Sequence, residues 1–186
     1  LSTPVGQLPL STAAERMEAF KQLRDYVKTR PHREAMAWVE EICGELGAEP
    51  AEHNVLGWEA LRQLAREGVT LGAHTRTHPL VNRISIDEVR DEALGSLEDL
   101  RREVGQVPPI FAYPSGGFND DVVRALGRAG FALAFTTAVG LNDLGRAHRL
   151  LLRRVNVGQR TNLAVLRARL LPWAVHLNRL EPLAGA

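Results

Sequence analysis

The sequence is poor in the residues that would place it in several large classes of protein. Its one cysteine, Cys43, allows neither an intrachain disulfide nor a metal site built from several thiolates. No apolar run approaches the roughly 18–20 residues that cross a bilayer. The opening stretch LSTPVGQLPL has neither the basic region nor the long apolar segment of a signal peptide. These absences exclude a disulfide-stapled domain and a membrane-spanning helix, and they leave the localisation open, cytoplasmic or extracytoplasmic.

A strong net charge is also missing. The chain carries 23 Lys and Arg against 22 Asp and Glu, so its net charge of +1 gives no general attraction to nucleic acid or membranes. Acidic residues are absent between Leu144 and Leu180, where eight arginines lie. Aromatic residues are sparse there, so no nucleic-acid partner is expected. A helix in this region would either pack Leu163, Leu166 and Leu170 on the domain or lie on an anionic surface; we expect packing, and no membrane association.

The residues that are present have the composition of a soluble globular domain, with 45% apolar and 24% charged residues over a length of 186. Local signals predict two helices near the N-terminus. Thr12 and Glu15 form a capping box that opens the first helix. Pro31 suits the first turn of a second helix, which Gly47 would end. Residues 1–54 are therefore expected to form a helical region that precedes the core.

From residue 55 onward, helical and strand-like segments alternate. This pattern predicts parallel strands covered by helices, an α/β fold of the barrel or doubly wound class. The roughly four strands expected are too few to close a barrel, and the exposed edges of an incomplete barrel could favour self-association. The predicted helices cover 58–67, 85–105, 119–130 and a segment from Thr161 that Pro172 should kink, and the predicted strands cover 69–73, 109–114, 131–137 and 153–157.

Two histidines follow the predicted strand 69–73. His74 and His78 stand four residues apart in the stretch GAHTRTHP. On an extended strand they would lie about 13 Å apart, too far for one ion. In a helical or tightly turned segment they would lie roughly 5–6 Å apart on one face, which suits a zinc ion. Pro79 favours such a turn, although solvated or capping histidines remain the alternative interpretation of this pattern alone.

A second turn lies in the stretch FAYPSGGFND. The strand ends near Tyr113, Pro114 fixes the turn, and Ser115 and Gly116 expose backbone N–H groups before the next helix. Backbone donors at a strand-to-helix turn can stabilise a developing negative charge, as in an oxyanion hole. The alternative is an ordinary connection in which glycine serves only to tighten the turn.

Together the two stretches resemble the polysaccharide deacetylase family (carbohydrate esterase family four). The second motif of that family, H-[ST]-x-x-H, is commonly written GxHTxxHP and is similar to GAHTRTHP. Its third motif, an aromatic-rich strand that ends in proline and glycine, is similar to FAYPSGG. The helix SIDEVRDEALGSLEDLRREVG between them has the expected length, and GFALAFTTAVG and LLRRVNV resemble the later strands of the family. The resemblance covers about residues 55–160.

The resemblance implies a metal-dependent hydrolase on a distorted (β/α) barrel. In the family a divalent metal, usually zinc, is held by two histidines and one aspartate. It activates water to remove an acetyl group from an N-acetylated sugar or polysaccharide. By this resemblance His74 and His78 are metal ligands, the backbone N–H groups at Ser115 and Gly116 form the oxyanion hole, and Tyr113 with Pro114 lines the substrate groove.

The chain departs from the family pattern in its missing acids. The first motif, T-F-D-D-G, supplies both the metal-binding aspartate and the general base, and it is absent from these 186 residues. The late motif with a catalytic histidine is not recognisable either. His148 and His176 are possible replacements, but a surface position is expected for each.

The arginine of the third motif is missing as well, since Ala112 stands in its place. Arg154 is a candidate substitute in the stretch RRVNV, where Arg154 and Asn156 alternate with two valines. If the valines pack under the outer helices, Arg154 and Asn156 point into the barrel, where Asn156 would contact substrate and Arg154 could orient an aspartate. An edge strand with solvated arginines is the alternative.

Two hypotheses for the function follow. In the first, the chain is the C-terminal part of a deacetylase that is catalytic only with the missing N-terminal strands. Residues 1–54 would then be a helical insertion or lid, 55–160 the deacetylase core and 161–186 a C-terminal helix. In the second, the chain is a non-catalytic carbohydrate-binding or assembly module that retains the fold.

Overall fold

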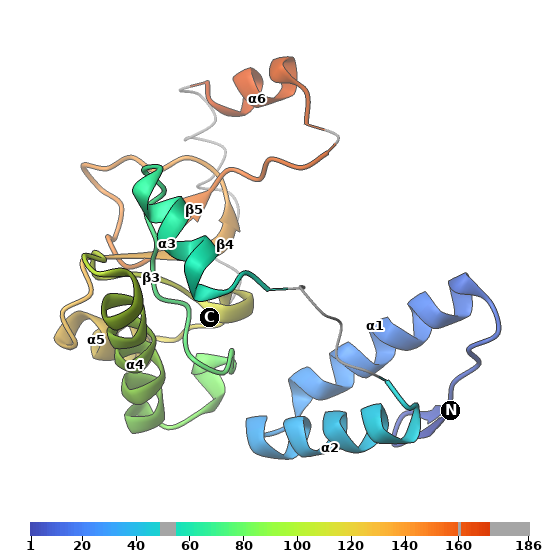
Figure 1. Cartoon of the computed structure of the whole chain (residues 1–186). Coiled ribbons are helices and arrows are strands. Elements are labelled where there is room, and N and C mark those ends of the chain that lie inside the picture. The colour runs from blue at the N-terminus through green and yellow to red at the C-terminus, as the bar shows by residue number, and fades with distance from the viewer. Residues whose placement is uncertain (49–54, 160, 172–186) are drawn as a thin grey trace. The chain divides into compact units, whose positions relative to one another are not determined.

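A computed structural model describes residues 1–48, 55–159 and 161–171 (Figure 1). Contacts divide the chain into two units, Leu1–Asn54 and Val55–Ala186. Among the described residues, no helix combines the length and the apolar run needed to cross a bilayer. The further separation of a core at 55–160 from a C-terminal helix at 161–186 stays a prediction.

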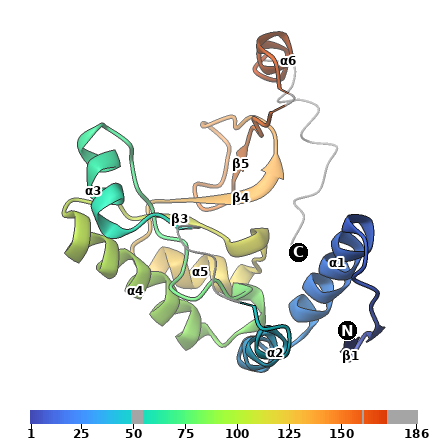
Figure 2. The same ribbon diagram turned by 45° about the vertical axis from the view of Figure 1, so that its right-hand side comes forward.

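The first unit is a pair of helices preceded by a short hairpin. The two predicted helices are confirmed, and they lie side by side in Figures 1 and 2. The capping box is formed in both directions: the Glu15 backbone N–H donates to Thr12 Oγ1 over 3.2 Å, and the Thr12 N–H donates to Glu15 Oε2 over 2.9 Å. The rings of Tyr26 and Trp38 meet edge to face at 5.0 Å and join the two helices. The elements are β1 (Ser2–Thr3), β2 (Gly6–Gln7), α1 (Ala13–Thr29) and α2 (His32–Glu45).

The second unit is built on a small parallel sheet. Its strands are ordered β3-β4-β5, and the predicted parallel pairing is confirmed. The predicted strand at 69–73 is reduced to one parallel bridge between Ala73 and Phe111. These strands form an open sheet among the described residues, and a barrel is not confirmed. The strands are β3 (Ile110–Ala112), β4 (Leu133–Val139) and β5 (Leu152–Arg154).

The last strand is shorter than predicted. Pairing stops at Arg154, and Val157 is 65% exposed. The condition that both valines pack under outer helices is not met at Val157, because the extended, paired backbone that would alternate the side chains ends three residues earlier. Strand alternation therefore does not predict the direction of the Asn156 side chain, which lies beyond the end of the strand.

Helices α4 and α5 supply the helical part of the core, and α3 packs against α4. The capping box of Ser85 and Glu88 is present, and Asn119 Oδ1 accepts the Val122 N–H over 2.9 Å, so both predicted helix starts are confirmed. Helices α4 and α5 lie side by side in both views (Figures 1 and 2). The helices are α3 (Trp58–Arg66), α4 (Ile86–Val104) and α5 (Asp120–Arg128), and the core includes Val89, Ala93 and Leu97 of α4, Val122 and Leu126 of α5, and Phe111, Phe131 and Ala134.

The C-terminal helix α6 (Leu163–Arg169) begins two residues later than predicted. Its N-cap is Asn162, whose side chain accepts the Val165 N–H, because the amide side chain competes well for the first helical donors. Leu163 and Leu170 are 61% and 51% exposed, so the packing expected of them is not found in the part of the chain that the structure describes. Pro172 lies outside the described residues.

Candidate active site

The two histidines are brought together by a tight turn. Their rings meet edge to face with centroids 4.9 Å apart, and both side chains are exposed. The turn begins directly after Ala73, whose N–H donates to Ile110 O and whose carbonyl accepts the Ala112 N–H. Pairing with β3 therefore holds the start of this turn at the carboxyl end of that strand. The tight turn predicted from the spacing is confirmed.

One nitrogen of His74 is already committed to the protein. Nδ1 lies 2.7 Å from the carbonyl oxygen of Ala112, and since a carbonyl can only accept, Nδ1 carries the proton. The other nitrogen, Nε2, is then the one with a free lone pair. Histidines that bind a metal commonly donate their second N–H to a carbonyl in this way. The arrangement gives His74 the tautomer and the orientation of a ligand.

The turn has a strained backbone. Thr75 and His78 have φ values of +64° and +59°, in the left-handed region that residues with a side chain rarely adopt. Thr75 Oγ1 donates to His74 O and accepts the His78 N–H over 3.1 Å. Strain of this kind persists only where the surroundings over-determine the conformation, and it concentrates at functional sites.

Helix α4 supplies those surroundings. Ser96 Oγ accepts the His74 N–H over 3.3 Å, and Glu92 Oε2 accepts the Arg76 N–H over 2.7 Å. Arg76 also forms a two-pronged ion pair with Asp99, with N···O distances of 2.6 and 3.0 Å. The Arg76 guanidinium, followed by that of Arg102, lowers the pKa of the Asp99 carboxyl to about 2. Sequence reasoning missed these α4 residues, although their spacing places them on one face of the helix.

Ser115, which was predicted to donate its backbone N–H in an oxyanion hole, lies in the turn η2 (Pro114–Gly116). Ser115 is exposed and has a φ of +52°. No hydrogen bond of its backbone N–H is found within the described residues. The Gly116 N–H instead donates to Tyr113 O over 3.0 Å, inside the turn. The oxyanion role of both groups stays a prediction, and in this conformation Ser115 has the open donor.

Tyr113 and Pro114 are core residues. Tyr113 is 1% exposed, and its hydroxyl donates to Leu150 O over 2.9 Å. Its ring packs against those of Phe111 and Phe118, with centroids 5.4 Å away in each case. Burial raises the pKa of the Tyr113 hydroxyl. The predicted contact of Tyr113 and Pro114 with substrate is untested, and the structure gives Tyr113 a stabilising role.

The remaining candidates lie on the surface. Arg154 is exposed, and its Nε donates to Thr136 O over 2.7 Å. Asn156 is exposed beyond the end of β5, and its carbonyl accepts from Arg169. His148 is exposed as expected, and its Nδ1 accepts the Leu150 N–H; His176 lies outside the described residues. The catalytic role of Arg154 and the substrate role of Asn156 stay predictions.

The side chains fit a divalent metal in part. Two imidazoles stand close enough to share one ion, and His74 offers Nε2. Yet within the described parts of the chain no three His, Cys, Asp or Glu side chains gather into a metal-binding group. The structure thus supplies two candidate ligands of a site that usually needs three.

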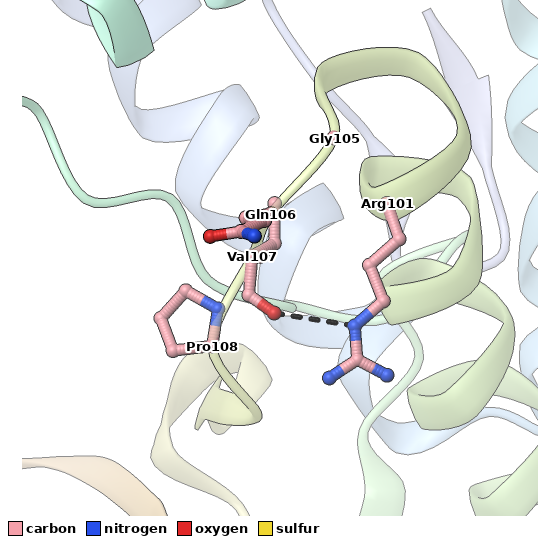
Figure 3. Close-up of a pocket in the computed structure, with 5 residues that line it drawn as sticks. All are labelled: Arg101, Gly105, Gln106, Val107 and Pro108. Atoms are coloured by element: carbon pink, nitrogen blue, oxygen red, sulfur yellow. Dashed lines mark hydrogen bonds between the residues drawn. The ribbon is translucent and has the colours of Figure 1, made fainter.

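The pocket in Figure 3 lies elsewhere. It is formed where α4 ends and the chain leads into β3, with Arg101 Nε donating to Val107 O over 3.2 Å. That is the amino end of β3, whereas the histidines and Ser115 lie at its carboxyl end. Because α/β proteins place their sites at carboxyl ends of strands, this pocket is not the candidate site.

Comparison with known proteins places this chain in a family. The family model described as polysaccharide deacetylase matches residues 27–134, more than half of the chain. The chain belongs to the polysaccharide deacetylase family. The match begins inside α1, earlier than the resemblance at 55–160, and ends before β5.

Individual relatives are distant. The Streptococcus pyogenes deacetylase PplD, solved in complex with acetate, is 24% identical with a TM-score of 0.60, covering 70% of this chain and 55% of PplD. BC0361, a polysaccharide deacetylase from Bacillus cereus, is 23% identical with a TM-score of 0.56, covering 63% and 37% of the two chains. At these identities the likeness shows the fold alone.

A curated relative matches a shorter stretch. The Bacillus subtilis (strain 168) protein "Putative polysaccharide deacetylase YxkH" is 24% identical over 82 residues, which is 44% of this chain and 29% of YxkH. The match spans only part of each of these relatives: 55% of PplD, 37% of BC0361 and 29% of YxkH.

Proposed function

We propose that this chain supplies the two-histidine half of the metal site, and the oxyanion turn, of a hydrolase that removes N-acetyl groups from carbohydrate. The observation that carries the proposal is the paired geometry of His74 and His78, with the Nδ1 of His74 tied to Ala112 O. Solvated histidines would not need a strained turn or a fixed tautomer. Family membership supports the reaction class.

The metal would be held by His74, through Nε2, and by His78, and zinc suits two imidazole ligands. When bound, a divalent metal supplies Lewis-acid activation of water for attack on an amide. The protein's own contribution is to fix the two rings before the ion arrives. The Nδ1 bond to Ala112 O does this for His74, because it fixes both ring orientation and tautomer.

Ser115 would stabilise the negative charge that develops on the amide oxygen. Its N–H is open, and it lies three residues beyond Ala112, the residue that holds His74. Both turns therefore lie at the carboxyl end of β3, which supports a shared site. In this proposal Arg154 and Asn156 would contact substrate as exposed side chains beside the carboxyl ends of the strands.

The missing carboxylates would come from the T-F-D-D-G motif that these 186 residues lack. The open parallel sheet would then be one part of an incomplete distorted (β/α) barrel. The proposed substrate is an N-acetylated sugar or polysaccharide, since hydrolysis of such an amide releases acetate, the molecule bound in PplD. A non-catalytic carbohydrate-binding module is the competing function.

Acetate release from N-acetylglucosamine oligomers with added zinc tests the proposal. We expect none from the 186 residues alone, and robust release from them would show that another acid replaces the missing aspartates. We also expect the coding sequence before Leu1 to specify T-F-D-D-G, and the extended polypeptide to release acetate unless His74 is replaced. An extended polypeptide that binds the oligomers without hydrolysis, equally well with and without His74, would favour the non-catalytic module.

A further inference from the structure

Glu92 on α4 forms the most extensive side-chain contact with the histidine turn. Its carboxylate accepts three hydrogen bonds: from the Arg76 N–H over 2.7 Å, the Thr77 N–H over 2.9 Å and the Thr77 hydroxyl over 2.7 Å. Hydrogen bonds to an ionised carboxylate are shorter and about twice as strong as neutral ones. Both donor residues lie between His74 and His78, so Glu92 holds the middle of the turn.

The backbone of the turn explains why such an anchor is needed. The positive φ angles stand on either side of the anchored residues, at Thr75 and at His78. Without an external tie, the segment would relax toward the broad extended or helical regions, since the left-handed region is unfavourable for a residue with a side chain. Either relaxation would change the distance between the two rings. Glu92 fixes Arg76 and Thr77, and hence the direction in which the chain enters His78.

Other residues on the same face of α4 complete the attachment. Asp99 binds the guanidinium of Arg76, and Ser96 accepts the N–H of His74. Gly95 leaves room for Arg76 to cross the helix, because a Cβ there would overlap the guanidinium. Positions 92, 95, 96 and 99 are three and four residues apart and form one stripe. The stripe faces the histidine turn along its whole length.

We propose that Glu92 is a positioning residue that holds the imidazoles of His74 and His78 in the geometry that binds one metal ion. Glu92 bonds Arg76 and Thr77 rather than the two histidines, and it acts through the backbone of the turn. The inference rests on the proposed function in its reference to a metal. The geometric part, the ring–ring arrangement without metal, stands independently.

The test compares Glu92→Gln with the wild-type chain and with Asp91→Asn. Glutamine keeps the size of the side chain but removes the charge and replaces one of the two accepting oxygens by an N–H₂ group. Asp91 is exposed on the same helix, and its side chain forms no hydrogen bond or ion pair among the described residues, so its variant removes the same charge without touching the turn.

Two measurements are made on each protein. In the metal-free chain, nuclear Overhauser effects between the His74 and His78 rings and the ring nitrogen shifts of His74 report the pair geometry and the tautomer. Zinc titration then reports affinity. For Glu92→Gln we expect loss of the ring–ring signal, a mixed His74 tautomer and zinc affinity weaker by about 10–100-fold, the usual effect of removing an outer-shell partner. For Asp91→Asn we expect no change.

The outcomes separate the two proposals. Wild-type ring contacts and zinc affinity in Glu92→Gln would overturn the positioning role. A wild-type chain that binds no zinc would contradict the proposed function, and the ring–ring signal would still decide the role of Glu92. If Glu92→Gln loses the amide spectrum of the core, Thr77→Val, which removes one of the three donors, is measured instead. There we expect a smaller loss in the same direction, and no loss would overturn the proposal.

Discussion

Replacing Tyr113 by phenylalanine removes one hydroxyl from the core of the second unit and decides whether that hydroxyl is structural. The ring is 1% exposed and would keep its packing, so no cavity forms. The carbonyl of Leu150, itself 3% exposed, would lose the donor that now lies 2.9 Å away. A buried acceptor left unpaired costs about 1–3 kcal/mol. We therefore expect the free energy of unfolding to fall by that amount.

Native-state hydrogen exchange of sheet amides is the suitable assay, since it reports this unit separately from the N-terminal helices. The amides of Tyr113 and Ala134, which donate to Phe135 O and Arg149 O, are the probes. Thr136→Val is a second comparison, because the buried Thr136 hydroxyl donates to Leu152 O over 3.1 Å and also accepts the Ala138 N–H over 3.2 Å, so this variant removes two hydrogen bonds. Unchanged exchange in Tyr113→Phe would refute the reasoning.

Tyr113→Phe should also change how the stability of the fold depends on pH in the alkaline range. Burial raises the pKa of Tyr113 in the folded chain above the unfolded value of about 10. The stability that comes from keeping the hydroxyl neutral is fully present below that unfolded value and is lost as pH rises above it. Tyr113→Phe should lack this part of the alkaline loss. An identical alkaline profile in both proteins would contradict the assignment.

Three further predictions concern the turns and α4. Gly116→Ala should lower the free energy of unfolding by roughly 1–3 kcal/mol in thermal denaturation, because its φ is +76° and the new Cβ would overlap the Thr137 side chain; wild-type stability would contradict this. Asp99→Asn should reduce the loss of folding stability at acid pH. The pKa of Asp99 is lowered in the folded chain, so its ionised carboxylate stabilises the fold fully above the unfolded pKa of about 3.9, and this contribution is lost as the pH falls toward about 2. A urea midpoint measured from pH 5 to pH 2 with an unchanged profile would argue against it. Gly95→Ala should leave stability within about 1 kcal/mol of wild type, because gained helix propensity offsets the displaced Arg76 ion pair, while zinc affinity falls; unchanged affinity would show that Arg76 is not needed.

Local signals in the sequence predicted the helix boundaries well. The capping boxes at Thr12 and Ser85, and the side-chain cap at Asn119, satisfy backbone groups within three residues, so they can be recognised from adjacent letters. Glycines at 68 and 130, with φ values of +90° and +87°, end their helices for the same local reason. Parallel pairing followed from the alternation of elements.

Features that depend on distant partners were not predictable in the same way. The strand expected at 69–73 pairs only through Ala73, because pairing needs a neighbour rather than propensity. Glu92 was missed because its donors lie more than a dozen residues earlier. The burial of Tyr113 was available from the alternation in β3: Phe111 and Tyr113 share a face, and that face is the core.

The central claim is that His74 and His78 bind one divalent ion. Zinc titration of the 186-residue chain, followed by calorimetry, tests this directly in wild type, His74→Ala, His78→Ala and, as a control, the exposed histidine variant His148→Ala. We predict weak binding of zinc to wild type and His148→Ala, and no binding to either of the other two variants, because a single imidazole cannot hold the ion. Tight binding that survives both His74→Ala and His78→Ala would contradict the account.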